Sequence, residues 1–124
     1  MVFEHRSKTE IFKITSRRHE GVMNVWFDDI LGSKDAKTPN PITGAWFRIE
    51  SGPNGTSATP PQYSYDEVGV VFEGEITLKD QQTGHQQTLR PGDTFAIQRG
   101  SIIEFSTKDY GVAWKCGGRA LAKL

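Results

Sequence analysis

The sequence predicts a single all-β domain, a β-sandwich or barrel with little helix. Apolar and polar residues alternate over short runs, which is the period of strands whose two faces have different surroundings. The runs end at Gly, Pro, Asn or Asp, the residues that favour turns, and helical periodicity is nearly absent. The length of 124 residues suits one domain with one core.

Short alternating segments follow one another along almost the whole chain. We expect strands over residues 10–15, 21–27, 42–49, 68–73, 75–79, 85–89, 94–98, 101–106 and 111–115. So many short strands are typical of a sandwich or barrel rather than of an α/β fold.

The connections are rich in turn-forming residues. Residues 28–31 could make one helical turn, whereas 32–41 and 51–61 contain Gly, Pro, Asn, Ser and Thr and are predicted to be loops that border the open end. Residues 75–89 are the clearest local element, because two strand-like runs flank a turn in which Gly84 can adopt a positive φ. We therefore predict a β-hairpin there.

The two ends are expected to differ from the barrel. Residues 1–20 form an N-terminal strand or arm, residues 21–116 the barrel and residues 117–124 a C-terminal tail. Two consecutive glycines end the last strand, so we expect the tail at 119–124 to fray rather than to dock on a partner subunit.

Composition excludes several classes of partner. Fifteen basic residues balance fifteen acidic ones, so there is no excess charge to hold nucleic acid or anionic lipid. No run approaches the roughly 20 apolar residues that cross a bilayer. The polar start lacks a secretory signal and Cys116 is the one cysteine, so we expect a cytoplasmic protein with a small-molecule substrate.

Two segments, YDEVGVVFEGE at 65–75 and RPGDTFAI at 90–97, resemble the conserved motifs of the cupin superfamily. The resemblance covers about the central half of the chain and implies a cupin jelly roll. In the first motif Gly55, Glu67 and Gly74 occupy the fixed positions, whereas Pro61 and Tyr63 stand where the family has metal-binding histidines.

The second motif departs from the family at its ligand as well. Gly92 and Gly100 match, but Gln98 replaces the proline and Ile103 replaces the histidine. Of four ligands that the resemblance implies, only Glu67 remains. We therefore predict a metal-independent protein without a cofactor.

A subgroup that includes ethanolamine-utilisation protein Q is still more similar. It too has Tyr-Asp-Glu before the strand, here 65–67, and Gly-Ser-x-Ile-Glu-Phe after it, here 100–105. This resemblance implies acetate or acyl-phosphate metabolism as an alternative function, although no P-loop is present to hold a nucleotide.

Three polar residues are the candidate catalytic group. Residues two apart in a strand share a face, so Tyr63 and Tyr65 should point into the barrel together with Glu67. Burial would raise the pKa of the carboxyl, and a phenol can donate a hydrogen bond to a developing oxyanion. The set suits isomerisation, dehydration or cyclisation; the alternative is that Glu67 only satisfies buried polar groups in a site that no longer acts.

Trp46 and Arg48 share one face of their strand, opposite Phe47 and Ile49. If the face of Trp46 and Arg48 lines the barrel, it offers stacking and a bidentate clamp for a carboxylate or phenolate. If it lies outside, Arg48 is a surface charge, and strand alternation does not decide between the two.

Further candidates for substrate binding are Trp114, which falls in mid-strand, and Gln98 and Ile103, which occupy the replaced motif positions. Trp26 also falls in mid-strand and is expected to pack in the core or against a partner. His5, His19 and His85 lack metal-ligand spacing and are not expected to bind a metal.

The leading hypothesis is a lyase, isomerase or cyclase without a cofactor, acting on a small aromatic or unsaturated organic acid, as a tailoring enzyme of secondary metabolism. Glu67 would be its acid or base. A third alternative is a non-catalytic module that binds or senses a ligand in the same pocket. The cupin resemblance implies a homodimer, through sheet edges or an exchanged strand at 10–15.

Overall fold

The computed structural model describes residues 3–7, 24–52 and 57–121. These residues form antiparallel strands and no helix, which confirms the predicted all-β class. The strands are β1 (Val25–Gly32), β2 (Thr43–Glu50), β3 (Ser57–Ala58), β4 (Glu67–Gly74), β5 (Ile76–Asp80), β6 (Gln86–Leu89), β7 (Thr94–Ile97), β8 (Ile103–Ser106) and β9 (Tyr110–Gly117). Among the described residues, no helix is long and apolar enough to span a bilayer.

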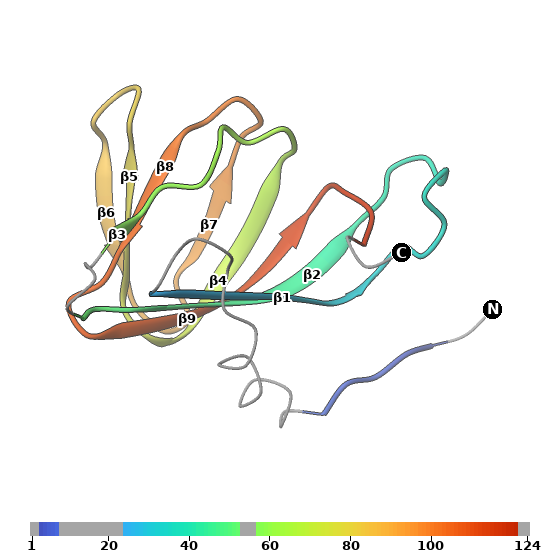
Figure 1. Cartoon of the computed structure of the whole chain (residues 1–124), viewed down its shortest axis with the longest axis horizontal. Coiled ribbons are helices and arrows are strands. Elements are labelled where there is room, and N and C mark those ends of the chain that lie inside the picture. Colours follow the sequence, from blue (N-terminus) through green and yellow to red (C-terminus); the bar gives the residue numbers. More distant parts are fainter. Residues whose placement is uncertain (1–2, 8–23, 53–56, 122–124) are drawn as a thin grey trace.

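The strands form two facing sheets. One has the order β1-β2-β9-β4-β7 and the other the order β3-β8-β5-β6. In Figure 1 the smaller sheet gathers at the left, whereas β1 and β2 extend past it to the right. The apolar side chains between the sheets form one core, whose most deeply buried members include Ile49, Val71, Ile76 and Phe105.

Most predicted strands are confirmed to within a residue or two, and the exceptions have local causes. The helical turn expected at 28–31 is wrong, because β1 continues through it with a register shift between Asp29 and Leu31 and pairs with β2 to its end. The loop expected at 51–61 contains the short strand β3, which pairs with β8. The strand expected at 10–15 lies outside the described residues, as do His19 and Gly55.

The predicted β5–β6 hairpin is confirmed, with Gly84 at a φ of 79°. The side chain of Asp80 holds the turn, because its Oδ1 accepts hydrogen bonds from the backbone N–H groups of Gln82 and Thr83 at 2.8 and 3.3 Å. An Asp that caps its own turn in this way is a local feature that the sequence specifies.

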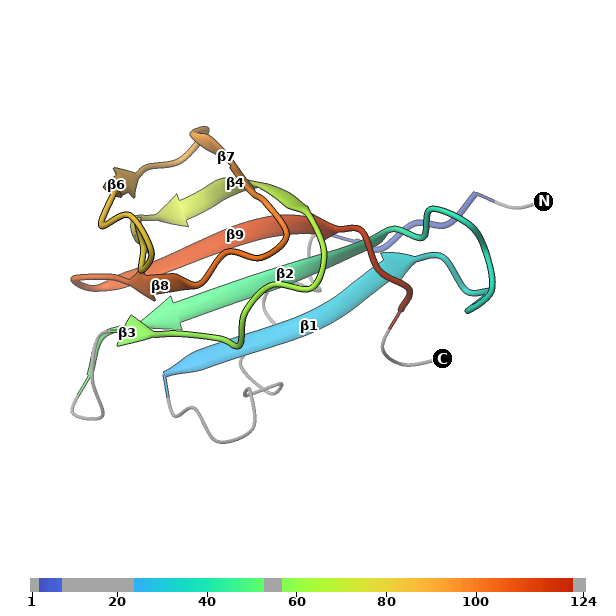
Figure 2. The same cartoon turned by 90° about the horizontal axis from the view of Figure 1, so that it is seen from above.

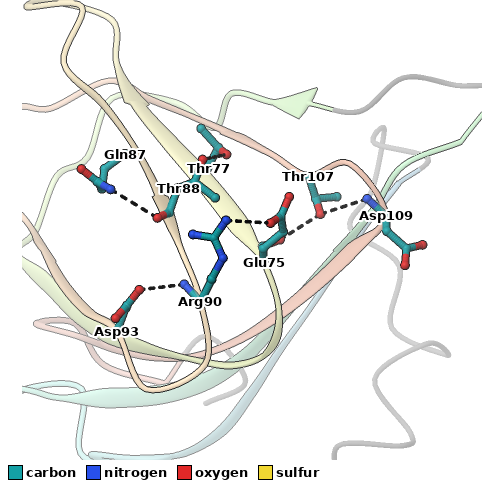
Figure 3. A network of polar contacts seen from close by, with 8 residues as sticks. All are labelled: Glu75, Thr77, Gln87, Thr88, Arg90, Asp93, Thr107 and Asp109. Carbon is teal, nitrogen blue, oxygen red and sulfur yellow. Dashed lines mark hydrogen bonds and ion pairs between the residues drawn. The ribbon is translucent and has the colours of Figure 1, made fainter.

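Polar contacts around the start of β5 tie the smaller sheet to the neighbouring turns (Figure 3). The hydroxyl of Thr107 donates to the carbonyl oxygen of Glu75 at 2.8 Å, and Asp93 accepts a hydrogen bond from the backbone N–H of Arg90 at 2.8 Å. Thr77 and Thr88 join β5 to β6 through their hydroxyls, 2.7 Å apart. These contacts hold the β8–β9 and β6–β7 connections in place.

The described part of the C-terminal tail docks, so the fraying expected for residues 119–121 is wrong. The Thr43 hydroxyl donates to the carbonyl oxygen of Arg119 at 2.7 Å, and the Leu121 N–H donates to the Ser33 carbonyl oxygen at 3.4 Å. Figures 1 and 2 show this segment beside the connection between β1 and β2. The tail therefore closes one end of the larger sheet.

Candidate functional site

A cavity of about 400 Å³ opens between the two sheets. Its wall is mainly aromatic and aliphatic, and its polar side chains include those of Glu67 and Lys115. The aromatic rings belong to Phe27, Phe47, Tyr63, Tyr65 and Phe105. Since a cavity of about 150 Å³ holds benzene, this one has room for a substituted or fused ring.

The Glu67 carboxylate lies at the wall of this cavity and is only 3% exposed. It stands at the first residue of β4, which pairs with β7 on one side and β9 on the other. Its Oε1 accepts a hydrogen bond from the Tyr63 hydroxyl at 3.0 Å and lies 3.5 Å from the Lys115 Nζ. Within the described part of the chain, no hydrogen bond reaches Oε2, so this oxygen can still accept one from a ligand.

Tyr63 reaches Glu67 from the connection between β3 and β4. Two backbone hydrogen bonds hold it there, from the Tyr63 N–H to the Ser101 carbonyl oxygen at 2.9 Å and from the Gly100 N–H to the Tyr63 carbonyl oxygen at 2.8 Å. Burial, and then the charge of Glu67, raise the pKa of the Tyr63 phenol well above its ordinary value. The phenol therefore keeps its proton at neutral pH and acts as a donor.

Lys115 reaches the same carboxylate from β9 and is 3% exposed. Its Nζ lies 4.0 Å from the ring centre of Phe47 and 3.9 Å from that of Phe105, so two aromatic faces solvate the ammonium. Burial lowers the pKa of Lys115, and the charge of Glu67 opposes this shift only in part. The site thus pairs a buried acid with a buried base.

Tyr65 and Arg119 lie next to this pair. The Tyr65 ring packs against Tyr63, with ring centres 5.4 Å apart, and burial raises the pKa of its phenol. The Arg119 guanidinium lies 5.5 Å from the Tyr65 ring and donates two hydrogen bonds to Asp29, at 2.8 and 2.7 Å. These hydrogen bonds raise the pKa of Arg119, so the docked tail keeps a permanent cation beside the cavity.

The structure brings the three candidate catalytic residues, Tyr63, Tyr65 and Glu67, to one cavity. Strand alternation beside Glu67 is the signal that predicted this placement. Whether these residues catalyse a reaction stays a prediction.

The candidate binding residues Trp46, Arg48 and Trp114 do not line the cavity, and of the two orientations left open for Trp46 and Arg48 the structure has the outer one. Phe47, between Trp46 and Arg48, faces inward, which turns both neighbours to the outer face of the sheet. There Arg48 pairs with Glu50 at 2.7 Å, and Trp114 packs against Trp46 with ring centres 5.0 Å apart.

The two candidates from the second motif also lie elsewhere. Gln98 is exposed, and it lies at the surface beyond the end of β7. Ile103 is buried in the apolar core rather than at the cavity wall. Neither therefore lines this cavity, and a role of either residue in substrate binding stays a prediction.

The donor set at the cavity does not fit the metal that the cupin fold implies. Of the four positions that correspond to ligands, Pro61 and Ile103 offer no donor atom, and Tyr63 uses its hydroxyl as a donor to Glu67. The Glu67 carboxylate is already paired with an ammonium group. The described residues contain no group of three or more His, Cys, Asp or Glu side chains placed to hold an ion, and His5 and His85 are exposed.

The residues that sequence reasoning missed are the ones that complete the wall. Lys115 sits between Trp114 and Cys116, and the pattern of β9 alone did not say which face would be inward. Phe27, Phe47 and Phe105 were not among the predicted site residues, and Arg119 belonged to a tail that was expected to fray. A lysine in a largely apolar strand was the one available signal, because such a charge is buried only when it is paired.

No family sequence model matches the chain, and no curated protein sequence matches it significantly. Solved structures do match in fold. The putative ethanolamine utilization protein Q of Salmonella typhimurium is 22% identical, with a TM-score of 0.67 over 84% of this chain and 78% of that one. The EutQ protein of Clostridium difficile is 19% identical, with a TM-score of 0.68 over 86% and 79%.

A third structure of the same fold is the polyketide cyclase RemF of Streptomyces resistomycificus, which is 20% identical with a TM-score of 0.62 over 81% of this chain and 68% of that one. A cupin superfamily protein of Desulfitobacterium hafniense covers 95% of this chain with a TM-score of 0.65. The chain therefore has the cupin jelly-roll fold, as its motifs predicted.

Proposed function

We propose that this protein is a cupin-fold enzyme that transfers protons to and from a small, largely apolar metabolite, in an isomerisation, dehydration or cyclisation. One observation carries the proposal: a nearly fully buried carboxylate, one oxygen of which accepts no hydrogen bond from the described residues, lines an aromatic cavity of about 400 Å³. Buried ionisable groups with specific partners in a cleft are typical of catalytic sites.

Glu67 is the proposed proton acceptor and donor. Its Oε1 is held by Tyr63 and Lys115, which fix the orientation of the carboxylate, while Oε2 takes a proton from the substrate and returns it. The Tyr63 hydroxyl, which stays protonated, can turn its hydrogen bond toward an oxyanion that develops on the substrate. Aromatic rings on the wall exclude water and favour an aromatic or unsaturated substrate.

Acyl-phosphate chemistry has less support from the site. The two cations at or beside the cavity, Lys115 and Arg119, are each paired with a carboxylate, so neither is disposed to hold a phosphate group. The likeness to the two ethanolamine-utilisation proteins concerns the fold, and a shared fold does not carry a function with it.

Proton exchange at carbon tests the proposal directly. The protein is incubated in D₂O with a panel of small aromatic and unsaturated ketones and acids, and deuterium incorporation is followed by NMR. We expect exchange with at least one compound, and a loss of about 100-fold or more in Glu67→Gln, since general acid–base catalysis contributes roughly 10²–10⁴-fold.

Glu104→Gln is the matched control, because Glu104 alternates with the buried Ile103 and Phe105 on β8 and points away from the core. It should exchange at the wild-type rate. Wild-type exchange by Glu67→Gln would remove Glu67 from the mechanism. A compound that binds in the cavity without exchange, across the panel, would instead indicate a binding module.

A further inference from the structure

The acid–base proposal leaves the Lys115 amine without a chemical role of its own. Among the described residues that line the cavity, Lys115 has the one basic side chain. Two phenylalanine rings lie within 4.0 Å of its Nζ, and its polar contact is with Glu67 Oε1 at 3.5 Å. A lysine used only for stability would be costly here, because burying a charged pair rarely stabilises a fold relative to apolar packing.

We propose that Lys115 forms an imine with the substrate, and that the substrate class is therefore an aldehyde or ketone. The inference rests on the proposed function only in taking the same cavity as the substrate site. Three features of the geometry support it: the amine lines the cavity, an apolar wall surrounds it, and a carboxylate stands within reach to exchange protons with it. Desolvation in an apolar pocket is a known way to activate a lysine nucleophile.

Proton transfer within the buried pair prepares the nucleophile. The Lys115 ammonium gives one proton to Glu67, which yields a neutral amine and a neutral carboxylic acid. Because both charged groups are almost fully removed from water, this neutral pair is far less unfavourable than it would be at the surface.

The same two side chains carry out the covalent step, with Lys115 as the nucleophile and Glu67 as the proton donor. The Nζ lone pair attacks the carbonyl carbon, the C=O electron pair moves to oxygen, and one N–H proton follows it to give a carbinolamine. Glu67 then protonates the hydroxyl, water leaves, and the nitrogen lone pair forms the C=N bond. The products are a protonated imine, a Glu67 carboxylate and one water molecule, so the net charge does not change and no oxidant or reductant is needed.

Formation of the imine would assist the proton transfer proposed for Glu67. A protonated imine attracts electrons from the adjacent carbon, so a proton on that carbon becomes easier to remove. The regenerated Glu67 carboxylate lies beside the nitrogen and can accept that proton through Oε2. Isomerisation and cyclisation of carbonyl compounds both begin with this step.

Reductive trapping tests the inference on the wild-type protein. Benzaldehyde and sodium cyanoborohydride are added at neutral pH, and benzylated peptides are quantified over time by mass spectrometry. We expect Lys115 to be labelled at least tenfold faster than Lys108, an exposed lysine that serves as the internal control. In urea the two rates should become similar, because the advantage of Lys115 comes from the folded cavity.

A second experiment uses benzyl alcohol as a competitor, since it has nearly the shape of benzaldehyde but no carbonyl group. In excess it should slow the labelling of Lys115 and leave that of Lys108 unchanged. Labelling of Lys115 no faster than Lys108 in the folded protein would overturn the inference, and so would labelling that benzyl alcohol does not slow.

The two proposals can fail separately. Unselective labelling together with a loss of proton exchange in Glu67→Gln would overturn the imine and leave the acid–base function standing. Selective labelling without any proton exchange by the wild type would support the imine and overturn the acid–base function.

Discussion

The Glu67 carboxylate receives its two polar contacts on the same oxygen, from groups that differ in charge and in origin. Tyr63 comes from the connection before β4, whereas Lys115 comes from β9, which pairs directly with β4 in the same sheet. One contact is from a neutral donor and the other from a cation. Their contributions to stability should therefore differ in pH dependence.

Substitution of Tyr63 is expected to reveal that dependence. The pKa of Tyr63 is raised in the folded protein, whereas in the unfolded chain it is about 10. Above pH 10 the unfolded chain loses this proton and the folded protein keeps it, so the wild-type free energy of unfolding falls as pH rises. Tyr63→Phe has no phenol at this position, so its free energy of unfolding does not fall for this reason.

Urea unfolding at pH 8, 9, 10 and 11 measures the effect. Near pH 8, Tyr63→Phe should be less stable than the wild type by about 1.5–3 kcal/mol, the net value of a hydrogen bond to a charged group. The difference in unfolding free energy between the wild type and Tyr63→Phe should become smaller between pH 9 and 11. A difference that stays constant over this range would mean that the phenol is not desolvated in solution.

At the scale of elements, β1 and the C-terminal tail hold each other at one end of the barrel. The register shift in β1 falls at Asp29, which receives the guanidinium of Arg119, and Thr43 at the start of β2 binds the Arg119 carbonyl oxygen. The tail is thus fastened to both strands of the β1–β2 pair. It lies beside Tyr65, at the edge of the cavity.

Arg119→Met should cost about 2–3 kcal/mol of unfolding free energy, because the nearly buried Asp29 carboxylate loses two guanidinium hydrogen bonds. Arg90→Met is the control: Arg90 is 68% exposed and 3.8 Å from its partner Glu75, so its loss should cost less than about 0.5 kcal/mol. Urea unfolding of the two variants makes the comparison. Equal costs would show that the tail does not dock in solution.

For the whole molecule, the outer face of the five-stranded sheet carries an unusual amount of exposed apolar surface. Val68 is 56% and Phe72 52% exposed on β4, and the Phe72 ring packs against Trp46, which in turn packs against Trp114. Contiguous apolar surface of this kind marks interfaces in soluble proteins. The homodimer expected from the sequence stays a prediction, and this face is its best-supported interface among the described residues.

Sedimentation of the wild type should give the mass of a dimer, and Phe72→Asp should shift it to a monomer, because the new charge would be buried in the interface. Gln87→Asp introduces the same charge at an exposed position on β6 and should leave the dimer intact. A monomeric wild type would contradict the dimer, whereas a dimeric Phe72→Asp would place the interface on another surface.

Local patterns were sufficient to predict much of this molecule. Alternation and turn residues predicted the all-β class, the β5–β6 hairpin with Gly84 and most strand positions, because these depend on neighbours close in sequence. The same alternation predicted that Tyr63 and Tyr65 lie with Glu67, and the structure brings them to one cavity although both precede β4. Where one bulge interrupted the pattern, at Asp29, the prediction of a helical turn was wrong.

Which face of each strand turns inward was decided by the assembly of the two sheets. Alternation in β2 separates Trp46 and Arg48 from Phe47 but is satisfied equally well by either orientation, and the same holds for Lys115 in β9. The inward choice depends on which rings from the other sheet complete the core, and Phe105 comes from a different sheet than Lys115. The buried acid and base therefore exist only as a tertiary arrangement, since contacts between residues 48 positions apart, such as Glu67 and Lys115, leave no trace in a local pattern.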